Sequence, residues 1–214
     1  MLAKANRMQK LVEGGIVAIL RQIPEEKAVQ VAESLVEGGV TAIEVTVQSA
    51  GALRSIEAIA ARIGERAVVG AGTVLDAETT RMAINSGAEF LFCPSVHEDV
   101  IRTSLRYGKI VVPGAMTPTE MIQAMEWGAD LVKVFPAATL GAGFVKDVRG
   151  PFPHIPLIPT GGINLGNAAA FIQAGAVSLG VGSSLVDNKL IAAGEYAALQ
   201  QRAEQFVNAV QSAR

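Results

Sequence analysis

The feature that most constrains the fold is a strict alternation of short apolar runs with stretches whose apolar residues recur at helical spacing. A glycine followed by Val or Ala ends a helical stretch before the next apolar run at Gly39, Gly87, Gly128 and Gly175. These glycines are 48, 41 and 47 residues apart, and each interval holds two strand–helix units. Strict alternation favours parallel strands with right-handed crossovers. Because about eight such units fit the chain, we expect an α/β fold of the closed (β/α)8 TIM-barrel type, with an open doubly wound sheet as the structural alternative.

The apolar runs and the helical periodicities give the expected boundaries. Eight strands are predicted at residues 16–20, 41–46, 67–71, 90–92, 110–112, 130–136, 156–158 and 178–181. Helices are predicted at residues 28–36, 52–63, 77–85, 98–107, 144–148, 168–173 and 194–213, with an extra N-terminal helix at 2–12. Another helix is expected after Thr117-Pro118-Thr119-Glu120, which has the signature of a helix N-cap. Because no linker or low-complexity segment interrupts the pattern, we expect a single domain over residues 1–214.

Charge and hydropathy exclude several classes of partner. The net charge is −2, so no basic surface indicates a nucleic-acid partner. No apolar run reaches the roughly 18 residues that a membrane span needs. The sequence shows no secretory signal, so we expect a cytoplasmic protein without a membrane partner.

The number and spacing of the cysteine and histidine residues argue against disulfides and metal sites. Cys93 is the only cysteine, so a disulfide within the chain is excluded, and we expect it to be a small buried hydrophobe. His97 and His154 are far apart and lack the spacing of metal ligands, so we expect no metal site.

A lysine stands in the middle of the apolar strand predicted at residues 130–136. In an extended strand Leu131, Lys133 and Phe135 share one face, while Val132 and Val134 share the other. Burial lowers the pKa of an amine and frees it to act as a nucleophile, as Schiff-base formation requires. The structural alternatives for Lys133 are an ion pair or an amine that reaches solvent from the end of the strand.

Glu44 is a second polar residue inside an apolar strand. It stands between Ile43 and Val45, as Lys133 stands between two valines. If both side chains face the barrel axis, each supplies the other with a counter-charge and a proton partner. Glu44 is then a candidate acid/base beside a nucleophilic amine, and a structural ion pair is the alternative interpretation.

Glycine-rich segments follow the last two predicted strands. Gly161-Gly162 and the segment 180–184 each precede a helical stretch, and small residues let an anion approach the backbone N–H groups. In (β/α)8 enzymes the loops after strands seven and eight often bind phosphate. These segments therefore indicate a phosphate or carboxylate ligand, unless they are simply tight turns.

Four motifs together resemble a known family. Glu44-Val45-Thr46, Gly70-Ala71-Gly72-Thr73-Val74, Lys133-Val134-Phe135-Pro136-Ala137 and Thr160-Gly161-Gly162 occur in the order and spacing of the bacterial 2-keto-3-deoxy-6-phosphogluconate (KDPG) aldolases, which also act as 4-hydroxy-2-oxoglutarate (KHG) aldolases. The resemblance extends over about residues 16–185. It implies a class I lyase that cleaves KDPG to pyruvate and glyceraldehyde 3-phosphate, needs no metal or cofactor, and assembles as a homotrimer.

The resemblance also implies roles for individual residues. Lys133 resembles the Schiff-base lysine, and Glu44 resembles the group that moves protons, through a water. Thr73 resembles the hydroxyl that holds the substrate carboxylate, and Pro94 and Phe135 look like the apolar walls of the pyruvate pocket. Of the remaining matched positions, a hydroxyl contact and the phosphate-binding residues are implied at Thr160, Gly161, Gly162, Ser183 and Ser184.

One position departs from the family pattern. Many members have an arginine two residues after the threonine of the first motif, where this chain has Gln48. Glutamine donates hydrogen bonds but carries no charge. Arg21, at the end of the first predicted strand, is a candidate for the missing charge on the substrate carboxylate.

Alternatives to KDPG cleavage stay open at this point. Within the family, the substrate can be the phosphogalactonate epimer or unphosphorylated 4-hydroxy-2-oxoglutarate. A phosphosugar isomerase or epimerase, or a non-catalytic barrel that binds a phosphorylated metabolite, would use the glycine-rich loops without an imine. The pairing of Glu44 with Lys133 favours an aldolase, because the last two alternatives leave that pair unexplained.

Overall fold

The apolar runs form short parallel strands that are buried on both faces in the computed structural model, which describes residues 2–214. Strands covered on both sides need apolar residues on both sides, and this is why they are continuous apolar runs in the sequence. The strands are β1 (Ile16–Leu20), β2 (Ala42–Thr46), β3 (Val68–Gly72), β4 (Phe90–Phe92), β5 (Ile110–Val112), β6 (Gly114–Ala115), β7 (Val132–Val134), β8 (Leu157–Pro159) and β9 (Leu179–Val181).

Hydrogen bonding arranges these strands into two parallel ladders. One sheet has six strands in the order β5-β4-β3-β2-β1-β9, and the other has three in the order β6-β7-β8. Two links join the ladders: only Pro113 separates β5 from β6, and Thr160 pairs with Gly180 in an isolated parallel bridge. The six-stranded sheet is curled, and its consecutive order lacks the reversal that defines a doubly wound sheet. The expected barrel of eight strands in one closed ladder is thus seen only in part.

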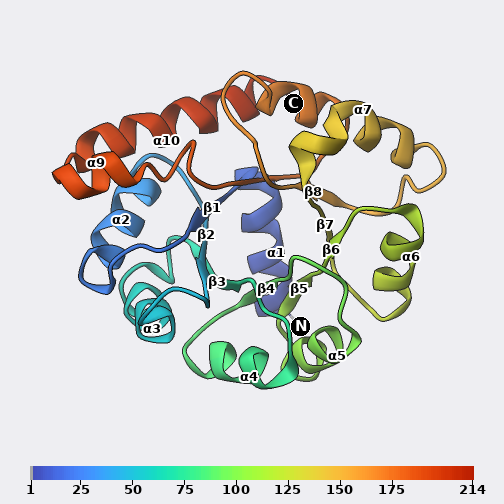
Figure 1. Ribbon diagram of the computed structural model, residues 1–214, viewed down its shortest axis with the longest axis horizontal. Helices are drawn as coiled ribbons and strands as arrows, with labels where there is room; N and C mark the ends of the chain where they lie inside the picture. The colour runs from blue at the N-terminus through green and yellow to red at the C-terminus, as the bar shows by residue number, and fades with distance from the viewer. Residues whose placement is uncertain (1) are drawn as a thin grey trace.

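The helices surround the curled sheet in Figure 1. They are α2 (Glu25–Glu37), α3 (Ala52–Ile63), α4 (Ala77–Asn85), α5 (Glu98–Arg106), α6 (Pro118–Glu126), α7 (Ala137–Arg149), α8 (Ala168–Gln173), α9 (Asn188–Ala193) and α10 (Tyr196–Gln211). Apart from α9 and α10, which come after the last strand, each of these helices follows a strand and leads to the next, as parallel strands require.

The extra N-terminal helix, α1 (Leu2–Gly14), lies across the middle of the molecule rather than in the outer layer (Figure 1). Its buried Leu11 packs in an interior cluster with Val17, Ala42 and Val68, which lie in the first halves of β1, β2 and β3. The helix therefore covers the amino-terminal end of the sheet. The carboxyl ends of the strands lie at the opposite edge, which is where ligands bind in other α/β proteins.

Large side chains fill the space inside the curled sheet, and glycines on neighbouring strands leave room for them. Phe90 and Phe92 pack edge to face inside the sheet, with ring centroids 5.3 Å apart and an interplanar angle of 66°. A Cβ at Gly70 would lie 2.5 Å from the Phe90 ring, so only glycine fits beside that ring. Gly72 makes the same kind of space for Glu44.

Three features differ from the sequence-based predictions by more than a small shift of boundary. The fifth predicted strand, 110–112, is β5, but an unpredicted two-residue strand, β6, follows it after Pro113, which has no N–H to donate to a ladder. Helix α7 begins at Ala137, seven residues before the predicted start, with a kink where Gly141 has a φ of 76°. A short helix, α9, precedes α10, and Gly194 separates them in the left-handed conformation.

No helix within residues 2–214 combines the length and the apolar character that crossing a membrane would require.

Candidate active site

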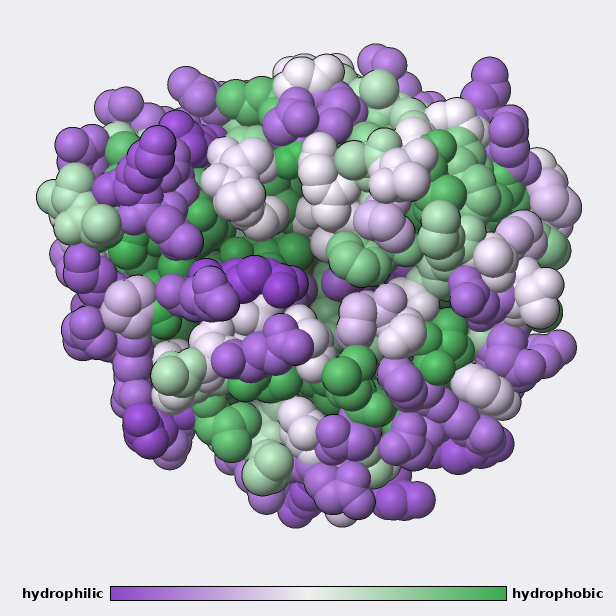
Figure 2. Space-filling model, in the orientation of Figure 1, coloured by the Kyte–Doolittle hydropathy of each residue, from purple (hydrophilic) through white to green (hydrophobic). Residues whose placement is uncertain are grey.

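A cavity of about 370 Å³ opens at the carboxyl ends of the strands, between β1, β7, β8 and β9. Figure 2 shows a hollow near the middle of this face, with hydrophilic side chains around hydrophobic ones. The walls of the cavity consist of residues that are far apart in the sequence. They are Ile19, Arg21, Gln22, Lys133, Phe135, Thr160, Gly161, Gly162, Ile163, Asn164, Gly182, Ser183, Ser184, Val186 and Asn188.

Lys133 is the buried cation of this cavity. It is central in β7, where it pairs with Gly114 on one side and Ile158 on the other, and it is only 5% exposed. Burial lowers the pKa of the Lys133 amine, and the charge of Glu44 acts in the opposite direction. An amine in this state has a larger neutral, nucleophilic fraction near neutral pH than a solvated lysine.

Glu44 lies deeper in the sheet, in the middle of β2, and is 1% exposed. Burial raises the pKa of its carboxyl group, while the positive charges of Lys133 and Arg21 lower it. Its Oε2 atom is buried without a hydrogen-bond partner among residues 2–214. A buried oxygen in this state has free capacity to accept a proton or a hydrogen bond.

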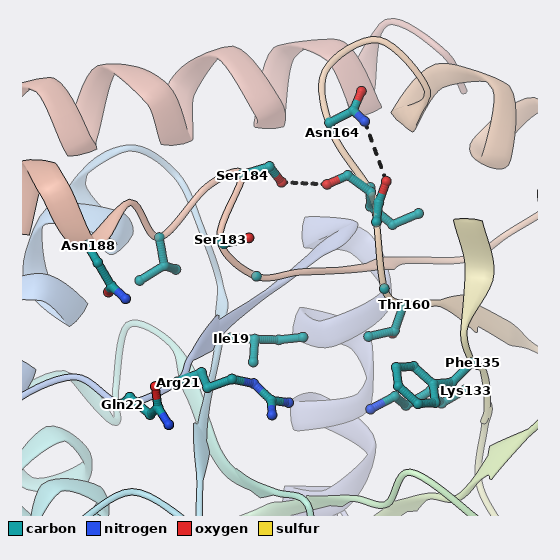
Figure 3. A pocket seen from close by; sticks show the side chains of 15 residues that line it. Ile19, Arg21, Gln22, Lys133, Phe135, Thr160, Asn164, Ser183, Ser184 and Asn188 are labelled. Carbon is teal, nitrogen blue, oxygen red and sulfur yellow. Dashed lines mark hydrogen bonds between the residues drawn. The ribbon is translucent and has the colours of Figure 1, made fainter. Parts of the chain in front are cut away.

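Arg21 follows the last residue of β1 and reaches across the floor of the cavity. Figure 3 shows its guanidinium and the Lys133 amine directed toward one another from opposite sides. The Arg21 charge also lowers the pKa of Lys133. Two cations that converge in this way favour an anionic group between them.

The segment that follows β8 forms the opposite wall. Thr160 is buried, and its hydroxyl lies in the space that a side chain at Gly180 would occupy. Gly161 and Gly162 have φ values of 95° and 76°, a region that suits glycine. A side chain at 161 would press on Phe135, and one at 162 would overlap Ala138.

Polar side chains hold this loop in place (Figure 3). Asn164 and Asn167 both donate from Nδ2 to the Gly162 carbonyl, at 3.4 and 3.0 Å. The Ser184 hydroxyl donates to the carbonyl of Ile163, which ties the segment after β9 to the segment after β8. The two glycine-containing segments therefore form one continuous wall of the cavity.

The structure brings eight of the predicted site residues to the cavity wall. They are Arg21, Lys133, Phe135, Thr160, Gly161, Gly162, Ser183 and Ser184. Of the other four, Glu44 is buried and acts on Lys133 through its charge. Thr73, Pro94 and Gln48 lie outside the set of lining residues, and Gln48 is exposed.

Several lining residues carried no signal in the sequence. Gln22, Asn164 and Asn188 are polar residues in or beside loops, where such residues are common. Gln22 is unusual in one respect: its φ is 54°, which is uncommon for a residue other than glycine. Its N–H donates to Ser49 Oγ at 2.9 Å, which fixes the segment beside Arg21.

In the part of the chain that the structure describes, no group of three or more His, Cys, Asp or Glu side chains is placed to hold a metal ion. Burial raises the pKa of the Cys93 thiol to about 12, so it stays protonated near neutral pH.

These features define an α/β protein with a cavity at the carboxyl ends of parallel strands, into which a buried lysine and an arginine project. Residues 8–202 match the family model described as KDPG and KHG aldolase, and the chain belongs to this family. It is therefore an aldolase, a carbon–carbon lyase.

Relatives and solved structures agree on the family. The chain is 34% identical over 171 residues to the 2-dehydro-3-deoxy-6-phosphogalactonate aldolase of Escherichia coli K12, covering 79% of this chain and 83% of that protein. It is 32% identical over 205 residues to the KHG/KDPG aldolase of the same organism, covering 95% and 96%. A structure described as native KDPGal superposes with a TM-score of 0.87 at 33% identity, covering 92% and 95%. The Zymomonas mobilis ZM4 KDPG aldolase with 3-phosphoglycerate superposes with a TM-score of 0.84 at 26% identity, covering 95% and 97%.

Proposed function

We propose that the protein cleaves 2-keto-3-deoxy-6-phosphogluconate to pyruvate and glyceraldehyde 3-phosphate through a Schiff base on Lys133. We extend the proposal to 4-hydroxy-2-oxoglutarate, which the same chemistry divides into pyruvate and glyoxylate. The observation that carries the proposal is the buried Lys133 amine, whose pKa burial lowers and which lines an open cavity. Membership of the aldolase family supports it.

The first half of the reaction uses the neutral amine. Lys133 Nζ attacks C2 of the keto acid to form a carbinolamine, which loses water to give a protonated imine. Glu44, with its free Oε2, is the proposed group that supplies and removes protons in these steps, through a water. Its raised pKa brings the carboxyl group closer to the neutral range in which an acid/base is most effective.

The second half breaks the carbon–carbon bond. Glu44 takes the proton of the C4 hydroxyl, the C4–O bond becomes the aldehyde carbonyl, and the C3–C4 electron pair moves into the protonated imine. The product on Lys133 is the enamine of pyruvate. Protonation at C3 and hydrolysis then release pyruvate and return the free amine.

Arg21 is the proposed partner of the substrate carboxylate. Its guanidinium and the Lys133 amine converge on the cavity floor, whereas Gln48 is exposed and outside the lining. Thr73 is proposed as a hydroxyl donor to the same carboxylate. Its φ of 61° is costly for a β-branched residue, and strain of this kind is typical of functional positions.

Two further contacts complete the proposed substrate site. Pro94 and Phe135 are proposed as the apolar walls around the pyruvate carbons, and Phe135 lines the cavity. Thr160 is proposed as a contact to a substrate hydroxyl, because its buried side chain lies between Lys133 and the loop after β8.

The loops after β8 and β9 are proposed to bind the phosphate. Gly161, Gly162, Ser183 and Ser184 line the cavity together, and Figure 3 shows Ser183 and Ser184 at the end farther from Lys133. Because the Ser184 hydroxyl donates to the Ile163 carbonyl, phosphate binding requires this hydroxyl to turn toward the ligand. The remaining donors are backbone N–H groups and Ser183.

A second candidate substrate is the C4 epimer, 2-keto-3-deoxy-6-phosphogalactonate. The E. coli relative at 34% identity is described as the aldolase for that epimer. Comparing kcat/KM for the two epimers and for 4-hydroxy-2-oxoglutarate decides between them. A phosphosugar isomerase or epimerase on this scaffold has no use for a buried lysine with a lowered pKa.

The imine is tested by incubating the protein with pyruvate, reducing with borohydride and mapping the adduct by mass spectrometry. We expect one reduced pyruvate adduct, on Lys133. Lys133→Met should give none, and the control Lys146→Met, which removes an exposed lysine on α7, should label like the parent protein. A folded sample without an adduct would overturn the Schiff-base proposal, and an adduct elsewhere would overturn the site.

The proposed function is accompanied by a proposed barrel and a proposed oligomeric state. Only Pro113 separates β5 from β6, and Thr160 bridges to Gly180, so we propose that the two sheets together act as one (β/α)8 barrel. We propose a homotrimer as its assembly, and sedimentation equilibrium tests this. Exposed apolar side chains that such an interface could cover are Leu75 and Met82 before and on α4, Leu105 and Tyr107 at the end of α5, and Met116 before α6.

A further inference from the structure

The Lys133 nitrogen lies over two aromatic rings. Its Nζ is 4.9 Å from the centroid of the Phe135 ring and 5.6 Å from that of Phe92. A cation within about 6 Å of a ring face is attracted to the negative charge of the π system. The two rings differ in origin, because Phe135 is two residues from Lys133 in sequence while Phe92 comes from another strand.

The Phe92 ring is the more deeply buried of the two. It is fully buried, whereas Phe135 is partly exposed at the cavity wall. Phe92 ends β4, pairs with Gly72 and Val112, and packs against Phe90. Since water is excluded from its position, attraction between its ring and a cation is stronger there than at a solvated site.

We propose that Phe92 is a positioning residue for Lys133, whose ring holds the amine toward the cavity and stabilises the positive charge that this nitrogen carries in the protonated imine. The proposal rests on the Schiff-base function proposed for Lys133. In the sequence Phe92 is indistinguishable from a core residue, and nothing in its local pattern points to this role.

Burial is the main factor that disfavours the charge on the Lys133 nitrogen, and a small number of neighbouring groups modify its effect. Glu44 on β2 stabilises the charge, and Arg21 after β1 opposes it. The Cys93 thiol after β4 stays protonated near neutral pH because burial raises its pKa. The Phe92 ring adds attraction without taking up a proton, so it stabilises the cation and leaves Glu44 free for proton transfer.

The test replaces Phe92 with phenylalanines that carry increasing numbers of ring fluorines. Fluorination withdraws charge from the ring face while it keeps the ring in place. At a pH where the free Lys133 amine is neutral, we expect the equilibrium fraction of protonated pyruvate imine to fall progressively, by roughly threefold to thirtyfold across the series. The pH midpoint of borohydride trapping should also fall, because the lost attraction destabilises the charged form of the amine.

Phe90 provides the matched control, because its ring lies in the same interior cluster and contacts the Phe92 ring. Fluorination at position 90 should leave the imine fraction and the pH midpoint unchanged. Equal responses at 90 and 92, or no response at 92, would show that the ring only fills space and would overturn the proposal.

A conventional variant gives an independent measurement. Phe92→Leu should lower kcat and the imine fraction, while the Kd for inorganic phosphate, which forms no imine, should be unchanged. A parallel loss of phosphate affinity, or an unchanged kcat, would contradict a role through Lys133. If the parent protein forms no pyruvate adduct, the Schiff-base function itself fails. If it forms one without dependence on the Phe92 ring, only this inference fails.

Discussion

The carboxyl group of Glu44 occupies the space that a side chain at position 72 would need. A Cβ built on Gly72 would overlap Glu44 Oε1, although the two residues belong to different strands. The proposed acid/base therefore depends on a glycine that never touches substrate in the proposed mechanism.

Gly72→Ala should displace Glu44 and lower kcat by about a hundredfold, since general acid–base catalysis contributes that much or more. The control is Gly143→Ala on α7, where a Cβ meets no atom within 4 Å. Steady-state kinetics on both variants, with circular dichroism to confirm folding, measure the effect. A folded Gly72→Ala protein with the parent kcat would rule out the dependence of Glu44 on this space.

The pH dependence of imine trapping should respond in opposite directions to two substitutions. Burial lowers the pKa of Lys133, so trapping by pyruvate and borohydride should reach half its maximum below the ordinary lysine value of 10.5. Arg21→Met removes a positive charge that lowers this pKa, so the midpoint should rise. Glu44→Gln removes a negative charge that raises it, so the midpoint should fall.

The control for this measurement is Arg66→Met, which changes an exposed arginine before the amino-terminal end of β3. It should leave the midpoint in place. Shifts of the same sign for Arg21→Met and Glu44→Gln would mean that something other than their charges controls the amine.

Removing both buried charges should stabilise the fold while abolishing activity. Glu44 and Lys133 are buried charges that act on each other without forming a salt bridge among residues 2–214, and replacing even a buried ion pair by uncharged groups is often neutral or stabilising by about 1–4 kcal/mol. We expect Glu44→Gln/Lys133→Met to unfold at higher urea concentration than the parent protein at pH 7. Each single variant leaves one buried charge without its counter-charge and should be less stable than the double variant. A double variant less stable than the parent protein would show that the pair contributes net stability.

Arg21 and Gln48 should differ in their effect on substrate binding. Arg21→Ala should raise KM about tenfold or more, because a charge-assisted contact to the carboxylate is lost. Gln48→Ala should change KM little, since Gln48 is exposed and outside the cavity lining. An unchanged KM for Arg21→Ala would refute the carboxylate role.

The C-terminal arginine should contribute to stability through the backbone of α1. Arg214 donates to the carbonyls of Val12, Glu13 and Val177, at 2.5, 2.7 and 3.2 Å. Arg214→Ala should lower the free energy of unfolding by about 1–3 kcal/mol, measured by urea denaturation. The exposed Arg66→Ala is the matched control, and equal stability of the two variants would contradict the prediction.

The strand positions could be predicted because burial on both faces leaves a continuous apolar run. Each of the eight predicted strand regions overlaps a strand. Strand β6 was missed because its two residues, Gly114 and Ala115, are too few to form an apolar run. The late start assigned to the helix now seen as α7 has a different origin, because Gly141 interrupts the helical geometry and hides the first turn.

The site residues that could be predicted are the charged side chains that stand in apolar, buried strands. Lys133 and Glu44 stand out because charged residues are rare in buried strands. Asn188 and Gln22 do not stand out, because polar residues beside loops are ordinary, and their place on the cavity wall depends on the tertiary fold. Phe92 is hidden for the opposite reason, since an aromatic residue in an apolar strand is expected whether or not a cation lies over it.

Because β1 pairs with β9, the six-stranded sheet cannot finish folding until β9 has been synthesised. Ile16 lies beside Leu179, so β1 finds one of its two neighbouring strands only after the chain has been made as far as β9. Until then one edge of β1 has unpaired N–H and C=O groups. Such an edge can pair with a strand of another nascent chain and so promote aggregation. Contacts so distant in sequence are formed slowly. The yield of folded enzyme therefore depends on how fast β1 pairs with β9. It also depends on chaperones that protect the unpaired strand until that pairing forms.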